Sequence, residues 1–177
     1  HTWQGEANLF HTFHDESTLD VKAYYFYSER GLPGAVILYN PKAEERLWDE
    51  NFFTQARYKK TFSPKWTLQA QAKFNHSWNK YEDTDVKYEN GKQTDINRQD
   101  EYYLSAAVLY QPVKGLELSL AQDGFINTLH TNINDSPNPV RYSSLTALNA
   151  RYQWGRIKLS GTLVGTFITE EVKAGNT

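Results

Sequence analysis

The sequence predicts an all-β chain, an antiparallel meander of about eight strands that forms part of a transmembrane β-barrel. Three observations predict this fold. Apolar and polar residues alternate along several segments, and aromatic residues make up 15% of a chain in which only 39% of residues are hydrophobic. Short and long connections also alternate strictly, as in outer-membrane barrels with short periplasmic turns and long extracellular loops.

Eight segments carry the strand pattern. In chain order they are 7–13, 19–28, 52–59, 66–79, 101–111, 116–121, 145–152 and 157–167. The alternation is clearest in 66–79, where even positions such as Leu68 and Phe74 are mostly apolar and odd positions such as Gln71 are all polar. A period of two gives a strand one apolar face and one wet face. Trp66 and Trp78 would lie roughly 30 Å apart along a barrel axis, close to the height of a membrane band bordered by aromatic residues.

The connections indicate how the chain is organised. Segments 14–17, 63–65, 112–115 and 153–155 are short and rich in turn residues, whereas segments 30–50, 81–99 and 127–143 are long and charged. When the strands are followed in chain order, both ends of the chain lie on the long-loop side. We therefore expect residues 1–177 to be a segment of a single outer-membrane β-barrel domain, without its plug and remaining strands. An autonomous eight-stranded barrel fits the size but would have its ends on the opposite side.

Composition excludes several classes of protein. Lys and Arg number 19 and Asp and Glu 21, giving a net charge of −2, which argues against a nucleic-acid partner. The chain has no cysteine, so disulfides and thiol nucleophiles are absent. The longest apolar runs are about five residues, far below the roughly 18 that a membrane-spanning helix needs. The five histidines include no pair with catalytic or metal-ligand geometry, so the sequence predicts neither an enzyme nor a cofactor or metal site.

One acidic segment, 82–101, is a candidate calcium site because it gathers carboxylates. Lys87, Lys92 and Arg98 interrupt the acids, and no Asp-x-Asp-x-Asp-Gly order is present. A solvated charged loop is therefore the favoured interpretation. Within it, Asn90-Gly91 predicts a tight hairpin turn.

Ligand-binding residues are expected in the long loops and the upper lumen. Trp48, Tyr81 and Tyr142 could stack on a planar or macrocyclic ligand, and Arg30 and Arg141 could donate paired hydrogen bonds to a carboxylate or phosphate. Packing within a loop, or anchoring at the lipid interface, is the alternative role for each of them.

Two motifs resemble barrel segments of TonB-dependent outer-membrane receptors, especially those of Bacteroidetes-type bacteria. They are Arg30-Gly31-Leu32-Pro33-Gly34 after an aromatic strand, and Asp123-Gly124-Phe125-Ile126-Asn127-Thr128-Leu129 with the later Arg141-Tyr142-Ser143-Ser144-Leu145. The resemblance implies a 22-stranded barrel with an amino-terminal plug, located in the cell outer membrane and in contact with its lipid. It implies import of a scarce nutrient such as an iron-siderophore, haem or cobalamin, driven by TonB through the plug, with a surface lipoprotein as a further partner.

Two alternatives fit the same sequence. One is a passive porin-like channel or a small structural outer-membrane barrel, which would lack the plug. The other is a soluble carbohydrate-binding β-protein, although such proteins rarely need strands this long with so wet an opposite face.

Overall fold

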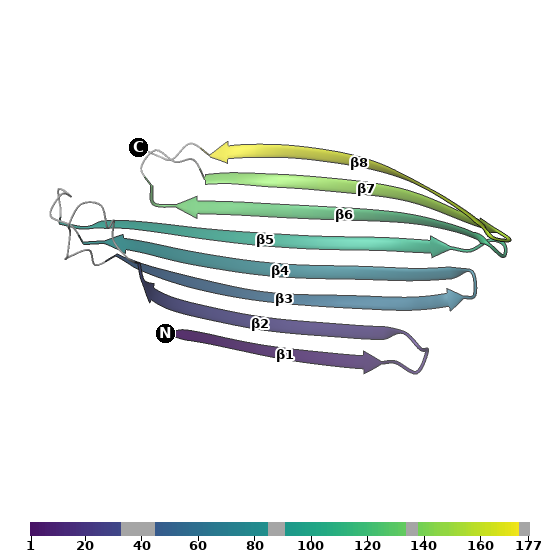
Figure 1. The fold of residues 1–177 in the computed structure, drawn as a ribbon, viewed down its shortest axis with the longest axis horizontal. Helices are drawn as coiled ribbons and strands as arrows, with labels where there is room; N and C mark the ends of the chain where they lie inside the picture. The colour runs from purple at the N-terminus through teal and green to yellow at the C-terminus, as the bar shows by residue number, and fades with distance from the viewer. Residues whose placement is uncertain (33–44, 85–90, 134–137, 174–177) are drawn as a thin grey trace.

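The chain folds into one antiparallel meander. The computed structural model describes residues 1–32, 45–84, 91–133 and 138–173, and every regular element in them is a strand. The strands are β1 (Thr2–Thr12), β2 (Thr18–Gly31), β3 (Arg46–Ser63), β4 (Trp66–Asp83), β5 (Gln93–Tyr110), β6 (Leu116–Thr131), β7 (Asn138–Trp154) and β8 (Ile157–Lys173). They pair in chain order, with β1 and β8 at the edges (Figure 1). The predicted all-β meander of eight strands is confirmed.

No helix in the described residues is both long enough and apolar enough to span a bilayer.

The register places the apolar residues of successive strands on one face of the sheet. Ala72 pairs with Ala56 on β3 and with Leu104 on β5, whereas Lys73 pairs with Gln55 and Tyr103. We call the first side the apolar face; one row across it, from β1 to β8, is Leu9, Val21, Ala56, Ala72, Leu104, Gly124, Ser144 and Phe167. The other side, the polar face, has the adjacent row Asn8, Lys22, Gln55, Lys73, Tyr103, Phe125, Ser143 and Ile168. The predicted split between even and odd positions of β4 is therefore confirmed.

The strands extend well into the segments predicted as long loops. β3 and β4 each have 18 residues, and their pairing continues to Arg46 and Glu82. The β4–β5 pairing continues to Asp83 and Gln93, which leaves a much shorter connection than the predicted 81–99. The predicted loop bounds were wrong because charged residues interrupt the apolar alternation there, whereas backbone pairing needs no apolar side chain.

Four short turns gather at one end of the sheet, as predicted, and β1 begins and β8 ends at the opposite end (Figure 1). One of these turns requires glycine. Gly115 has φ +87°, and a Cβ there would lie 2.5 Å from the carbonyl oxygen of Gln153. The backbone nitrogen of Gln153 donates a hydrogen bond of 2.7 Å to the Gly115 carbonyl, so two neighbouring hairpin ends are joined.

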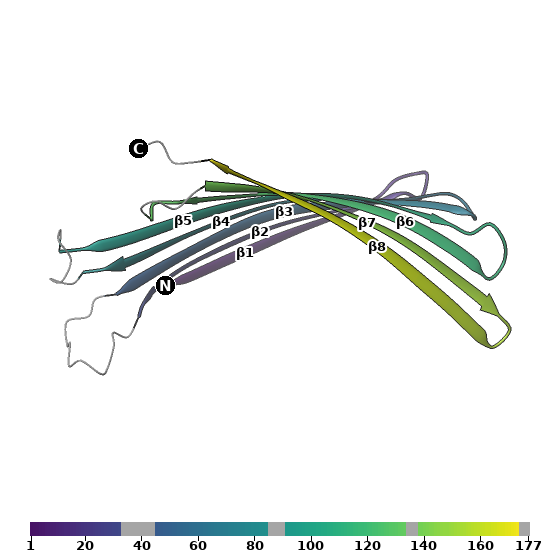
Figure 2. The same ribbon diagram turned by 90° about the horizontal axis from the view of Figure 1, so that it is seen from above.

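The sheet is a single curved layer (Figure 2), and its described residues form no hydrophobic core. None of the described hydrophobic residues is buried, and Trp3 and Leu163 are 70% and 69% exposed. A domain that folds in water stacks at least two layers so that their apolar faces cover each other. The apolar face must therefore contact something outside the described residues.

Candidate functional site

Two rows of aromatic side chains border the apolar face. The row toward the long connections, here the long-loop belt, consists of Phe52, Phe74, Tyr102 and Tyr142. Its ring centroids lie 6.4 Å apart for Phe52 and Phe74 and 5.0 Å apart for Phe74 and Tyr102. The row at the other end, here the short-turn belt, consists of Phe62, Trp66, Tyr110, Tyr152 and Trp154, in which Trp66 and Tyr110 stack at 4.1 Å.

The band between these belts is free of charge over much of the sheet. In β4 to β8, all described, no Asp, Glu, Lys or Arg lies on the apolar face between the belts. On β3 one charged residue, Lys60, lies on this face between the belt residues Phe52 and Phe62; it lies beside Phe62 and reaches Asp15 in the first turn at 2.6 Å. Tyr102 and Tyr110 are eight residues apart, and Tyr142 and Tyr152 ten. At a strand tilt near 40° these spacings correspond to a band of roughly 20–25 Å.

Three polar side chains in this band bond to one another. The amide nitrogen of Gln122 donates to the Ser144 hydroxyl at 2.8 Å, and the Thr146 hydroxyl donates to the Gln122 amide oxygen. An apolar medium would require such hydrogen bonds among the three side chains, because polar groups in hydrocarbon have no water as an alternative partner.

Ion pairs connect neighbouring strands on the polar face. Lys22 bonds Glu6 at 2.8 Å and Lys73 bonds Glu101 at 3.2 Å. Arg57 pairs with Asp20, whose second carboxylate oxygen is buried and has no hydrogen-bond partner. These side chains are about a quarter to three-fifths exposed, so each pair contributes little to stability. Their main effect is to leave this face wet and nearly neutral.

At the centre of the polar face, two lysines flank one aromatic ring; we call this the lysine–phenylalanine cluster. The Nζ atoms of Lys22 and Lys73 lie 6.0 Å and 5.9 Å from the ring centroid of Phe53, on which Tyr24 stacks at 5.2 Å. Beside it, a hollow of about 580 Å³ is lined mainly by amide and charged side chains, including Asn8, Asp20, Gln55, Arg57 and Gln71, together with the aromatic Tyr103. The arrangement offers hydrogen-bond donors and acceptors beside aromatic surfaces, which suits a polar ligand of modest size.

The five residues predicted to bind ligand do not form one site. Arg30 and Tyr81 lie on the polar face near the long connections, separated by Leu47 of the intervening strand. Arg141 is also on the polar face, three strands beyond Tyr81.

Both arginines already have acidic partners, Asp49 at 2.8 Å for Arg30 and Glu170 at 2.5 Å for Arg141. Trp48 and Tyr142 lie on the apolar face, where Trp48 lies beneath the Lys80 ammonium at 4.5 Å.

The acidic segment 82–101 is divided between β4, β5 and the connection between them. Glu82 pairs with Lys80 at 2.7 Å and with Lys92 at 2.9 Å. No group of three potential metal ligands occurs among the residues that the structure describes. Residues 85–90, including Asn90 of the predicted turn, lie outside them, while Gly91 has the positive φ of +64° that such a turn requires.

Sequence reasoning missed two arrangements. The meeting of Lys22, Phe53 and Lys73 was not predicted, and the available signal was an aromatic residue, Phe53, within an otherwise polar stripe of its strand. Sequence reasoning also found no histidine–carboxylate pair, yet His76 Nδ1 and Asp100 lie 2.6 Å apart, just beyond the long-loop belt on the apolar face. Among the described residues, neither of the two is hydrogen-bonded to a serine hydroxyl that could act as a nucleophile.

No family model matches the chain, and no curated protein is similar enough to it to count as a relative.

Proposed function

We propose that this chain forms part of the wall of an outer-membrane β-barrel that belongs to a TonB-dependent receptor. One observation supports it most strongly: across β4 to β8 the apolar face is an uncharged band between two aromatic belts, while the opposite face of the same single layer carries ion pairs that are partly exposed. A barrel wall meets lipid outside and water inside. If a second protein layer covered the apolar face, as in a soluble sandwich, nothing would require aromatic belts at its two borders.

The receptor assignment rests on the resemblance of two motifs and on the polar face. The motif 123–129 lies within β6, and the described residues of the other motif, Arg30 to Leu32, lie where β2 ends at Gly31 on the long-loop side. In a receptor, the hollow beside the lysine–phenylalanine cluster would face the transport path. A scarce nutrient such as an iron-siderophore, haem or cobalamin would contact it after capture by the long connections, and TonB and a surface lipoprotein would be the protein partners.

The barrel part is tested by cysteine accessibility, because the native sequence has no cysteine. Ala72→Cys and Gln71→Cys are adjacent substitutions but lie on opposite faces. In outer membranes, a water-soluble maleimide should label the Gln71→Cys variant and not the Ala72→Cys variant, and unfolding in urea without detergent should expose the thiol of both. Equal labelling of the two folded variants would contradict a lipid-facing apolar side.

The receptor part is tested by uptake in whole cells that express the complete protein. Cells are supplied with an iron-siderophore, haem or cobalamin, with the TonB complex intact or deleted. We expect uptake of one of them to depend on TonB, and to fall when residues 36–41 between β2 and β3 are removed while barrel assembly is retained. Uptake that is independent of TonB would indicate a passive channel instead.

A further inference from the structure

One arginine on the apolar face lacks the acidic partner that its counterparts have. Arg46 bonds Glu29 at 2.8 Å, Lys60 bonds Asp15 at 2.6 Å, and Lys80 bonds Glu82 at 2.7 Å. These are the other lysines and arginines whose side chains are described on this face. Arg98 on β5 is exposed, and no carboxylate among the described residues lies within ion-pair distance of it.

The position of Arg98 is just beyond the apolar band. It lies four residues from Tyr102 of the long-loop belt, roughly 13 Å along the strand, between Trp78 on β4 and the exposed His130 on β6. Asp100 lies between Arg98 and the belt, but its carboxylate bonds His76. If the belts mark the edges of the hydrocarbon, the long arginine side chain reaches the depth of lipid headgroups.

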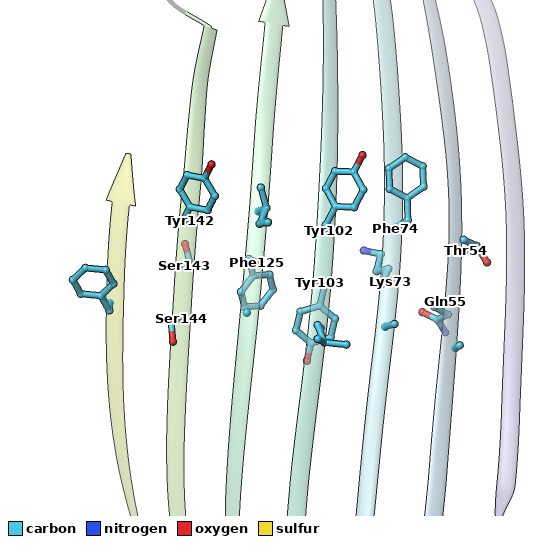
Figure 3. A pocket seen from close by; sticks show the side chains of 16 residues that line it. Thr54, Gln55, Lys73, Phe74, Tyr102, Tyr103, Phe125, Tyr142, Ser143 and Ser144 are labelled. Carbon is cyan, nitrogen blue, oxygen red and sulfur yellow. The ribbon is translucent and has the colours of Figure 1, made fainter. Parts of the chain in front are cut away.

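Below the belt, the apolar face is hollowed. A depression of about 610 Å³ has small residues such as Ala72, Gly124 and Ser144 at its base and Phe74, Tyr102 and Tyr142 along its rim toward Arg98. Figure 3 shows these three rings in a row across β4, β5 and β7. The apolar lining is what an extended hydrocarbon chain needs, and an uncompensated cation stands beyond its rim.

We propose that Arg98 and this hollow form a site for an anionic, phosphate-bearing membrane lipid. The guanidinium donates paired hydrogen bonds to the phosphate, His130 contributes a further polar contact, and an acyl chain lies in the hollow. The proposal rests on the proposed function, because the apolar face must contact lipid. The occupant is a lipid and not a free phosphate, because only a lipid places its charge and its hydrocarbon chain together.

Trp78 provides the test, because it is the cross-strand neighbour of Arg98. The complete protein, with the four other tryptophans of this chain replaced by phenylalanine along with any elsewhere, is reconstituted in vesicles of phosphatidylcholine brominated at the headgroup end of its acyl chains, the part nearest to Trp78, mixed with ordinary phosphatidylglycerol. The bromines are then exchanged between the two lipids. Fluorescence quenching gives the relative affinity of the site for each lipid. We expect a roughly fivefold preference for phosphatidylglycerol, the equivalent of about 1 kcal/mol.

Arg98→Gln should remove this preference, and Lys59→Gln, an exposed cation on the polar face, should leave it unchanged. Glycerol phosphate in solution should not compete. Native mass spectrometry of the protein with its natural tryptophans, given both lipids in detergent, repeats the comparison if the single-tryptophan variant assembles poorly. Quenching by both lipids without preference would overturn the lipid site alone. Absence of quenching by either brominated lipid would overturn the membrane placement of this face, and with it the proposed function.

Discussion

The two faces of the sheet satisfy their polar side chains in different ways. On the polar face, charges pair across strands while staying partly exposed, as Lys73 and Glu101 do at 35% and 29%. In the band of the apolar face, the strands β4 to β8 carry no charge, and Gln122, Ser144 and Thr146 form their own small network. The same backbone ladder supports both arrangements, so the fold alone does not cause the difference; in the barrel wall that we propose, its cause is the medium on each side.

The difference between the two faces also explains how a single layer can be stable. A sheet with one apolar face and no covering layer would associate in water, because large exposed apolar patches drive association. If lipid covers that face, its apolar residues need no partner in the protein, and only the polar side requires specific contacts.

An arginine placed in the middle of the band should distinguish the faces most strongly. Ala72→Arg should lower the free energy of unfolding from a bilayer by about 2–4 kcal/mol, because the charge must enter hydrocarbon. Gln71→Arg, one residue away on the polar face, should have almost no effect. Reversible denaturant titration in phospholipid vesicles measures both, and equal sensitivity at the two positions would show that the faces are wrongly assigned.

Coupling between Gln122 and Thr146 should be measurable and independent of salt. A double-mutant cycle with Gln122→Leu and Thr146→Val should give about 0.6 kcal/mol and at most about 1.7, the range found for hydrogen bonds within membranes. The same titration at low and high NaCl provides the measurement. A coupling that disappears in salt would point to a water-exposed pair.

The matching cycle on the polar face uses Lys73→Gln and Glu101→Gln. Its coupling should be about 0.2–1 kcal/mol at low salt, because both side chains are partly exposed to water. It should decrease as the ionic strength rises, since water and ions screen the pair. Unchanged coupling at high salt, about 1 M NaCl, would mean that this face is not water-filled.

The smallest effect concerns the first turn, outside both faces. The hydrogen bond from Lys60, with a further contribution from Ser17, holds the pKa of Asp15 below its ordinary value of 3.8. A lowered pKa stabilises the folded state at pH values above the ordinary one, and this contribution is lost as the pH falls through the lowered pKa. The stability difference between the natural protein and Asp15→Asn should thus be constant from about pH 7 to about pH 5 and shrink only in stronger acid. A difference that changes within that range would contradict the Lys60 contact.

The faces could be predicted from the sequence because side chains alternate in every strand, whatever lies next to it. Strand ends could not, because charges near the long connections find partners far away in sequence: Arg46 bonds Glu29, 17 residues away, and Arg30 bonds Asp49, 19 residues away. The sequence alone does not show that these partners are neighbours, because that depends on the register of the strands. Charge alone therefore suggested loops where the backbone continues as strand.

The candidate site was less predictable for the same reason. Lys22, Phe53 and Lys73 come from three strands, and their meeting depends on two registers. The even or odd position of each residue in its strand, however, could have shown that some of the residues expected to share a ligand lie on opposite faces. Arg141 and Tyr142 are consecutive in one strand, so they must lie on opposite faces.

The pairing of every strand with its neighbour in the chain has a kinetic consequence. Each hairpin can form from a continuous stretch of sequence, without waiting for a distant segment, and the sheet can grow by adding one strand at a time. Every stage of that growth, however, presents two open edges with unpaired backbone groups, which in hydrocarbon have no substitute partner. In the barrel wall that we propose, each new edge must therefore be paired with a further strand before it meets hydrocarbon.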